Sequence, residues 1–153
     1  MPSFDDAAGE LYQIAYRVAY RMLGSPLDAQ DVAQEIAARA WVRWSKVEPY
    51  ARAWVARSAA NLVLDRLRRS GHRVGLEPAV VSPVNADRVE LVMALRSLPK
   101  RQREVVVMRY LADLPEAEVA ERLGCSVGAV KQHAHRGLVA LRDGGHVTVE
   151  GER

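Results

Sequence analysis

Apolar residues recur along most of the chain at spacings of three and four, which is the period of an amphipathic helix, and no convincing strand-like alternation interrupts them. In the first helix, for example, one stripe consists of Leu11, Ile14, Ala15, Val18, Ala19 and Met22. The pattern predicts helices over residues 8–23, 28–44, 51–69, 86–97, 99–111, 115–123 and 127–142. We therefore predict an all-α fold.

Glycine and proline divide this helical pattern. Gly24-Ser25-Pro26 ends the first helix, because proline cannot continue the hydrogen-bond ladder, and Asp28 is expected to cap the second. Residues 70–85 contain two glycines and two prolines and lose all periodicity, which predicts a linker. The predicted organisation is two small helical domains with a linker between them and a flexible tail after them: residues 1–70, 71–85, 86–143 and 144–153.

The composition narrows the class of protein. Of the 153 residues, 49% are hydrophobic and 27% are charged, which excludes wholesale disorder. Cys125 is the only cysteine, which excludes a disulfide scaffold and a cysteine-rich zinc site. No apolar run approaches the roughly 20 residues that span a bilayer, and the N-terminus lacks the features of a signal peptide. We expect a cytoplasmic protein that does not enter the membrane.

The net charge of +3 is small, but the charges are unevenly distributed. Residues 1–35 carry six acidic and two basic side chains, whereas residues 57–73 carry five arginines and one aspartate. Residues 127–142 carry three basic side chains and no acidic one. One acidic and two basic zones indicate more than one kind of partner. An acidic first helix could also attract a basic last helix within one chain.

Residues 115–142 have the pattern of a helix-turn-helix, in which two short helices cross closely at a tight turn. Gly124 suits the turn, and Ser126 is well placed as the N-cap of the second helix. The predicted buried stripe of that helix is Val127, Val130, Ala134, Leu138 and Leu141. The opposite face, which we predict to enter the major groove of DNA, carries Gly128, Lys131, Gln132, His135 and Arg136. The alternative is an ordinary helical hairpin with a solvated basic face.

With this motif in its second half, the chain resembles an extracytoplasmic-function (ECF) sigma factor of bacterial RNA polymerase over about residues 8–143. The segment from Leu98 to Lys131 is similar to region four of that family. In the first half, Asp28-Ala-Gln-Asp-Val-Ala-Gln-Glu35 is similar to the region-two helix that binds the polymerase clamp. The segments similar to the part of the family that opens and reads the minus-ten element are Ala53-Trp-Val-Ala-Arg-Ser-Ala-Ala-Asn61 and Asp65-Arg-Leu-Arg-Arg69.

The resemblance implies a role for each half. The β′ clamp of core RNA polymerase would bind one helical face with Asp31, Gln34 and Glu35, although spacing alone fits a solvated acidic face as well. Asn61 would hold a flipped base of the minus-ten element, and the phosphates of that strand would contact Arg57, Arg66, Arg68 and Arg69. The minus-thirty-five element would contact Ser126, Gly128, Lys131, Gln132, His135 and Arg136. The polymerase β flap and an anti-sigma factor are implied as further partners.

The recognition helix departs from the commonest family pattern, because it has Ala129, Gln132 and His133 where the family often has threonine, serine and arginine. Ala129 lacks a hydroxyl that could contact phosphate, and a histidine is mostly uncharged at neutral pH. The minus-thirty-five sequence and its affinity therefore stay open, as do the regulon, the inducing signal and the identity of the anti-sigma factor.

Trp41 and Trp54 are expected to be core residues.

Three classes of function stay open at this point. A sigma factor would bind core polymerase and direct promoter recognition, DNA melting and initiation. A conventional helix-turn-helix regulator would bind duplex DNA as a dimer without polymerase, and a sigma-like interaction protein would bind its partners without directing transcription. We expect no enzyme, no catalytic residues and no cofactor. We also expect no metal site, because His133 and His135 are two residues apart and so lie on different sides of a helix.

Overall fold

The structure is a computed structural model that describes residues 3–74 and 83–144, with side chains for 3–69 and 88–144. Its elements are α1 (Phe4–Leu23), α2 (Pro26–Val42), α3 (Trp44–Val47), the 3₁₀ helix η1 (Glu48–Tyr50), α4 (Ala51–Val74), α5 (Pro83–Ser97), α6 (Lys100–Val106), the π-helix η3 (Val107–Leu111), α7 (Glu116–Leu123) and α8 (Val127–Asp143). The described ranges contain no strand, so the prediction of an all-α fold is confirmed.

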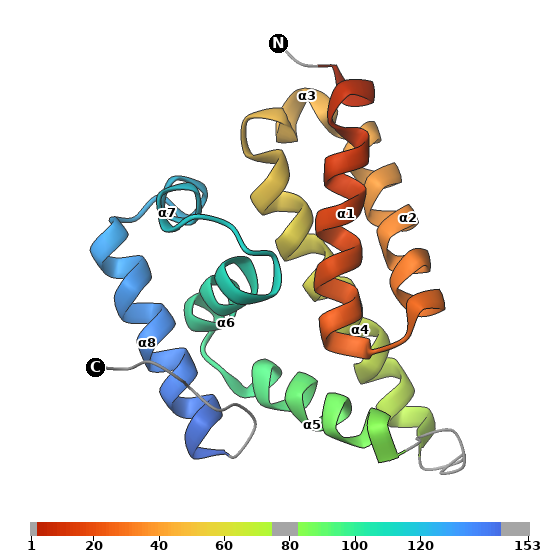
Figure 1. Cartoon of the computed structure of the whole chain (residues 1–153), viewed down its shortest axis with the longest axis vertical. Helices are drawn as coiled ribbons and strands as arrows, with labels where there is room; N and C mark the ends of the chain where they lie inside the picture. Colours follow the sequence, from red (N-terminus) through yellow and green to blue (C-terminus); the bar gives the residue numbers. More distant parts are fainter. Residues whose placement is uncertain (1–2, 75–82, 145–153) are drawn as a thin grey trace.

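The first half of the molecule is a bundle of α1, α2 and α4, with α3 and η1 at one end of it (Figure 1). All six residues of the predicted α1 stripe are buried. The α2 and α4 side chains that complete this core include Val32, Ala33, Ile36, Val55, Ala59 and Val63. Full burial of one large aliphatic side chain contributes about 1.5–3 kcal/mol, so this core is the main favourable term for the bundle.

Local signals set the ends of α1 and α2. Ser3 and Asp6 form a capping box at the start of α1, which begins four residues before the predicted start. Gly24 ends α1 with a φ of 71°, a conformation that glycine adopts without a Cβ clash. The prediction that Asp28 caps α2 is wrong, because Pro26 fits the first position of the helix and Ser25 is the cap. The Ser25 hydroxyl accepts a hydrogen bond from the backbone N–H of Asp28.

The second half consists of α5, α6, η3, α7 and α8. The chain passes from α6 directly into η3, and both α6 and α7 pack on α8. Figure 1 shows α8 on the side of the molecule away from α1 and α2. The core of this half includes Val92, Leu95, Val105, Met108, Val119 and Leu141. Two apolar side chains of α5 lie outside this core, since Val89 and Met93 are 37% and 51% exposed.

The two halves also contact each other directly. η3 lies against α1 and α4, α7 contacts α4, and α5 contacts α1 and α4. Both α4 and α5 extend into the predicted linker, because α4 ends at Val74 and α5 begins at Pro83. The rest of that linker and nearly all of the predicted tail, residues 75–82 and 145–153, lie outside the described residues.

Candidate nucleic-acid interface

The turn between α7 and α8 has the geometry that its sequence predicts. Gly124 ends α7 in the left-handed region with a φ of 67°, where glycine has no steric penalty. Ser126 caps α8, and its hydroxyl oxygen accepts a 3.0 Å hydrogen bond from the backbone N–H of Ala129. These contacts fix the start of α8, the helix with the predicted major-groove face.

The buried face of α8 consists of Val130, Ala134, Gly137 and Leu141. Gly137 is absent from the predicted stripe, yet a Cβ atom at this position would lie only 2.7 Å from Cγ2 of Val106. α8 and α6 therefore approach each other too closely for any larger residue. Two predicted core positions are wrong: Val127, the first residue of the helix, is 40% exposed, and Leu138 is only half-buried.

The opposite face of α8 is exposed at every predicted position, namely Gly128, Lys131, Gln132, His135 and Arg136. Lys131 Nζ lies 3.8 Å from Oε2 of Glu116 in α7. An exposed ion pair of this kind contributes about 0–1 kcal/mol, so a phosphate can readily replace the carboxylate. The face therefore combines basic side chains for phosphates with a glutamine that can reach a base edge.

A second candidate surface is the acidic ridge of α2, formed by Asp31, Gln34 and Glu35. Asp31 and Gln34 are exposed and Glu35 is half-buried. Arg66 of α4 forms ion pairs with Asp31 and with Glu35, the second at 2.7 Å. Glu35 also pairs with Arg39 at 3.1 Å. The structure thus brings two of the predicted polymerase-binding carboxylates against one of the predicted DNA-binding arginines.

A groove of about 610 Å³ lies between α2 and α4. Its lining includes Val42 of α2 and the next residue, Arg43, together with Trp54, Arg57 and Asn61 of α4. Asn61 is exposed, so its amide can both donate and accept hydrogen bonds at a base edge. An aromatic ring, an amide and arginines around one groove are the groups that hold an unstacked base and its phosphates.

The two tryptophans near this groove differ in burial. Trp54 is half-buried and packs against the core while it lines the groove. The expectation of a core role for Trp41 is wrong, because its side chain is 65% exposed. Ala40 occupies the buried position of α2, and the next residue of a helix points about 100° away from it.

The remaining predicted phosphate contacts have different surroundings. Arg69 is exposed, and Arg68 pairs with Asp65 of the same helix at 3.4 Å. Arg57 Nε lies 3.0 Å from Oε2 of Glu104 in α6, and the Glu104 side chain is only 7% exposed. Sequence reasoning missed Glu104, because a glutamate in an amphipathic helix is ordinarily solvated and only the contact between the two halves buries this one.

Residues 3–74 and 83–144 contain no group of three or more histidine, cysteine, aspartate or glutamate side chains arranged to hold a metal ion. None of the described helices is long and apolar enough to cross a membrane.

Two family models match the chain in the order of its two halves. Sigma-70 region 2 matches residues 8–73, which contain the acidic ridge and the groove. Sigma-70, region 4 matches residues 88–141, which contain the helix-turn-helix. The fold and these surfaces define a helical protein of the sigma class with one region of each kind.

The curated relatives specify the class further. The ECF RNA polymerase sigma factor SigW of Bacillus subtilis is 33% identical over 150 residues, which cover 83% of this chain and 80% of SigW. The RNA polymerase sigma-E factor of Streptomyces coelicolor is 36% identical over 136 residues, which cover 83% of this chain and 77% of that protein. This chain belongs to the family of ECF RNA polymerase sigma factors. It spans 62% of the length of another relative, the ECF RNA polymerase sigma factor SigE of Mycolicibacterium smegmatis, at 33% identity.

A solved structure supports the fold. The sigma factor RpoE of Bartonella quintana, in complex with the anti-sigma factor NepR, matches 95% of this chain and 98% of its own with a TM-score of 0.54. Its sequence identity of 18% limits that comparison to the fold. Family membership favours a sigma factor over the two other classes that the sequence left open, a dimeric regulator and an interaction protein.

Proposed function

We propose that this chain binds core RNA polymerase in the cytoplasm and directs it to promoters, where it supports DNA melting and initiation. The observation that carries the proposal is the presence in one chain, in family order, of an acidic ridge, a base-sized groove and an exposed basic recognition face. The chain contributes binding energy, and the chemistry of RNA synthesis belongs to the polymerase.

Each surface has one proposed partner. The acidic ridge of α2 binds a basic helix of the β′ clamp, because carboxylates on one helical face complement such a surface. The groove between α2 and α4 accepts an unpaired minus-ten base at Asn61 and Trp54, and the nearby phosphates contact Arg57, Arg66, Arg68 and Arg69. α8 enters the major groove of the minus-thirty-five element, with Ser126 and Gly128 near its N-terminus closest to the backbone.

The β flap and an anti-sigma factor complete the proposed partners. Leu95, Leu98 and Met108 of the second half are buried. Buried side chains cannot contact a partner. The exposed apolar side chains of α5 are Val89 and Met93, and we place the contact with the β flap there.

Co-purification with sigma-free core polymerase tests the first contact. The doubly reversed chain Asp31→Lys with Glu35→Lys is expected to lose affinity for core by about tenfold or more, because each change replaces an attraction by a repulsion. Asp5→Lys also reverses a charge, at an exposed position in the first turn of α1, and should leave the affinity for core unchanged. Equal retention of the reversed chain and the wild type would contradict the assignment of the ridge.

Promoter opening tests the groove. With core polymerase, Asn61→Ala is expected to lower the permanganate reactivity of unpaired minus-ten thymines by about tenfold, since the lost hydrogen bonds are worth roughly 1.5 kcal/mol. Ser58→Ala, in the lining of the same groove, should have a much smaller effect. Binding of duplex DNA by the chain alone, with no opening by its complex with core, would favour the dimeric regulator instead.

A further inference from the structure

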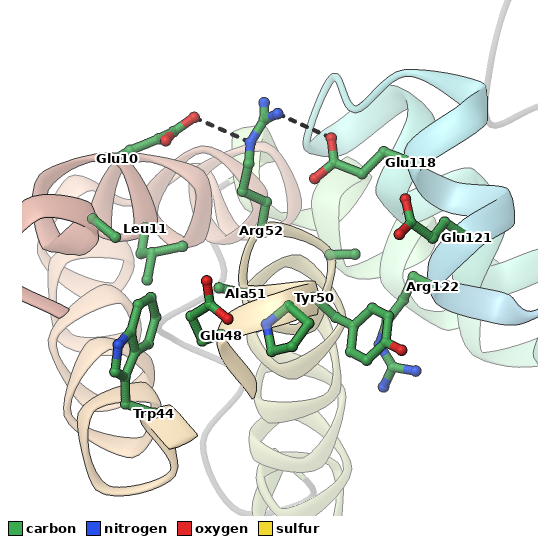
Figure 2. Close-up of a pocket in the computed structure, with 13 residues that line it drawn as sticks. Glu10, Leu11, Trp44, Glu48, Tyr50, Ala51, Arg52, Glu118, Glu121 and Arg122 are labelled. Carbon is green, nitrogen blue, oxygen red and sulfur yellow. Dashed lines mark hydrogen bonds and ion pairs between the residues drawn. The ribbon is translucent and has the colours of Figure 1, made fainter. Parts of the chain in front are cut away.

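A cavity of about 210 Å³ lies where α7 of the second half faces α1, η1 and the start of α4 (Figure 2). It shares no lining residue with the groove between α2 and α4, and none of the residues proposed to bind polymerase or DNA lines it. Pockets for drug-sized ligands usually measure about 300–1,000 Å³, so this cavity suits a smaller molecule. The proposed function leaves the cavity unexplained.

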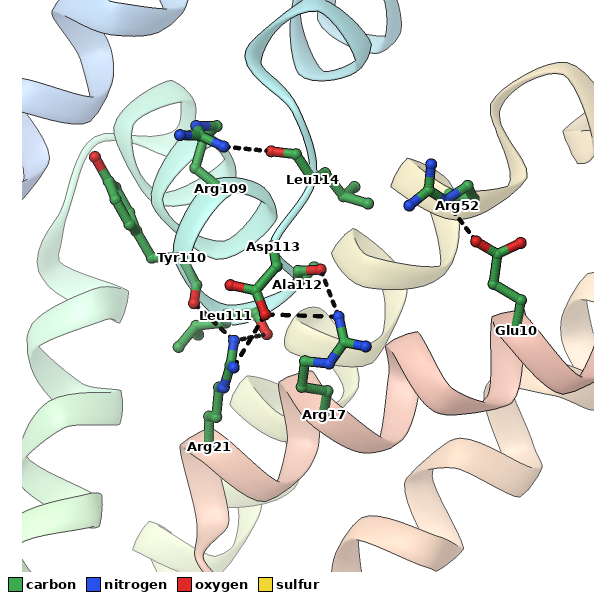
Figure 3. Close-up of polar contacts among 10 residues, drawn as sticks. All are labelled: Glu10, Arg17, Arg21, Arg52, Arg109, Tyr110, Leu111, Ala112, Asp113 and Leu114. Atoms are coloured by element: carbon green, nitrogen blue, oxygen red, sulfur yellow. Dashed lines mark hydrogen bonds and ion pairs between the residues drawn. The ribbon is translucent and has the colours of Figure 1, made fainter.

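Two contacts hold the α7 wall of the cavity against the bundle. Arg52 of α4 donates a 2.9 Å hydrogen bond to Glu118 of α7. Figure 3 shows the second contact, just before α7, where Arg17 and Arg21 of α1 pair with Asp113 at 3.6 and 3.0 Å. The cavity therefore has walls from both halves of the molecule, and ion pairs fix their relative position.

Aromatic and aliphatic side chains form one side of the cavity. Figure 2 shows Trp44 of α3 at one end and Tyr50 of η1 at the other, with Glu48 between them. Leu11 of α1 completes this side. The face of an aromatic ring attracts cations, and the Tyr50 ring already has one, since Cζ of Arg122 lies 5.7 Å from its centroid. Such a lining suits a ligand that is both cationic and partly apolar.

Carboxylates outnumber cations around the cavity. The lining has an excess of two negative charges, which results from Glu10, Glu48, Glu118, Glu121, Arg52 and Arg122. Arg52 is shared by Glu10 and Glu118. Within residues 3–69 and 88–144 no ion pair reaches Glu48 or Glu121, and Glu48 is half-buried. A cation in the cavity would therefore meet a carboxylate that no side chain of the described residues neutralises.

The titration of Glu118 reflects the same excess. Burial raises the pKa of this carboxyl group, the attraction of Arg52 does not offset the increase, and Glu10 and Glu121 raise the pKa further. The four glutamates are not arranged to hold a metal ion, since no group of metal-binding side chains is found within the described ranges. An organic cation fits the lining better, because its apolar part can contact the rings.

We propose that this cavity binds a small organic cation, a free amine or guanidine with a short aliphatic chain. Its charged group pairs with Glu48, and its chain lies against Trp44 and Leu11. The ligand contacts both halves of the molecule, because α7 forms one wall of the cavity. The site uses neither the groove nor the recognition face, so it stands or fails independently of the proposed function.

Calorimetric titration of the full chain with agmatine tests the site. Agmatine carries a guanidinium group and an amine on a four-carbon chain, and we expect a Kd of about 0.1–1 mM for a ligand of this size. Its analogue 4-guanidinobutanoate has a carboxylate at the end where agmatine has its amine, and it should bind at least tenfold more weakly. Equal or tighter binding of the analogue would overturn the proposal, since arginines would then define the site.

Matched variants locate the binding. Glu48→Gln retains the shape of the cavity and is expected to weaken agmatine binding about tenfold or more, whereas Glu90→Gln, an exposed position outside the lining, should not change it. Ala7→Leu narrows the cavity without changing any charge and should also remove the binding. If Glu48→Gln and Glu90→Gln have equal effects, or if Ala7→Leu has none, agmatine binds outside the cavity and the proposal is wrong. Far-UV circular dichroism checks that each variant is folded.

A peptide-like probe separates a free ligand from an arginine side chain of a partner protein. N-acetylarginine methylamide presents the same guanidinium group on a peptide backbone, and we expect it to bind at least tenfold more weakly than agmatine because the cavity is small. Tighter binding of this probe would overturn the assignment to a free cation. Agmatine at about 10 mM should also raise the Tm of the wild type but not that of Ala7→Leu. No heat of binding and no shift in Tm would refute the site.

Discussion

Arg66 is the residue at which two proposed functions meet. It pairs with Asp31 and Glu35 of the acidic ridge and is also a proposed phosphate contact. Arg66→Gln is expected to raise the affinity for core polymerase by about two- to tenfold, since two exposed ion pairs of up to about 1 kcal/mol no longer compete for the ridge. The complex should at the same time bind the minus-ten strand more weakly.

Arg68→Gln is the matched control for this prediction. Arg68 has the same proposed DNA role but pairs with Asp65, one turn earlier in α4 and outside the acidic ridge. Its replacement should weaken strand binding without changing the affinity for core, which surface plasmon resonance can measure. A loss of core affinity in Arg66→Gln would show that Arg66 supports the ridge instead of competing for it.

Gly137 sets the distance between α8 and α6. Gly137→Ala is expected to lower the free energy of unfolding by about 1–2 kcal/mol, because overpacking against the stiff Val106 side chain exceeds the gain in helix propensity. Gly9→Ala, in open space on α1, should instead stabilise by roughly 0.5–1 kcal/mol. Urea denaturation measures the free energy of unfolding of both variants. Equal stabilisation by the two substitutions would show that α6 and α8 can move apart at no cost in stability.

At the scale of elements, α8 depends on its cap. Ser126→Ala is expected to cost about 1 kcal/mol in the free energy of unfolding, because the backbone N–H of Ala129 loses its acceptor. Ser126→Asn retains a capping oxygen and should retain the stability. Thermal unfolding distinguishes the two, and an equal loss in both would assign the effect to another contact of Ser126.

The sequence predicted elements well where a local signal defines them. Ser126 and Gly124 placed the turn before α8, and the apolar stripe of α1 identified its buried face. The π-helix η3 has no comparable signal, because its end is held by a helix about 90 residues earlier. Arg21 of α1 donates hydrogen bonds to the carbonyls of Tyr110 and Leu111, and Arg17 donates one to the next carbonyl, that of Ala112. Gly137 does carry a sequence signal, since a glycine within a helical stripe indicates close packing.

At the scale of the whole molecule, the contact between the halves changes one titration. Burial raises the pKa of Glu118 above its ordinary value of 4.5, Arg52 lowers it, and Glu10 and Glu121 raise it further. The folded state therefore holds this proton more tightly than the unfolded state. The resulting stabilisation is complete below the unfolded pKa and is lost as the pH rises through the folded value.

Glu118→Gln tests the direction in which this contribution to stability changes with pH. The stability of the wild type relative to the variant is expected to fall as the pH rises from 4.5 towards neutrality, as measured by urea denaturation at a series of pH values. Glu90→Gln, which removes an exposed carboxylate of α5, is the matched control. A relative stability that rises with pH would mean that attraction to Arg52 outweighs burial.

The interdomain contacts were beyond the reach of sequence patterns. The acidic ridge, Asn61 and the exposed face of α8 could be named from spacing and resemblance. Glu104 and Asp113 could not, because their partners lie in the other half of the chain and neither residue stands out in its own helix or turn. The charge totals of segments predicted that acidic groups of the first helix would face the second half. In the structure, two arginines of that helix, Arg17 and Arg21, pair with Asp113 of the second half.

The central claim is that this chain gives core RNA polymerase its choice of promoter. Transcription in vitro from a pool of random promoters, with the chain added to sigma-free core polymerase, tests it most directly. We predict transcripts that start downstream of one shared motif with two blocks, one for α8 and one for the groove of the first half. Co-purification with core but no transcripts, or binding of duplex DNA by the chain without core, would contradict the claim.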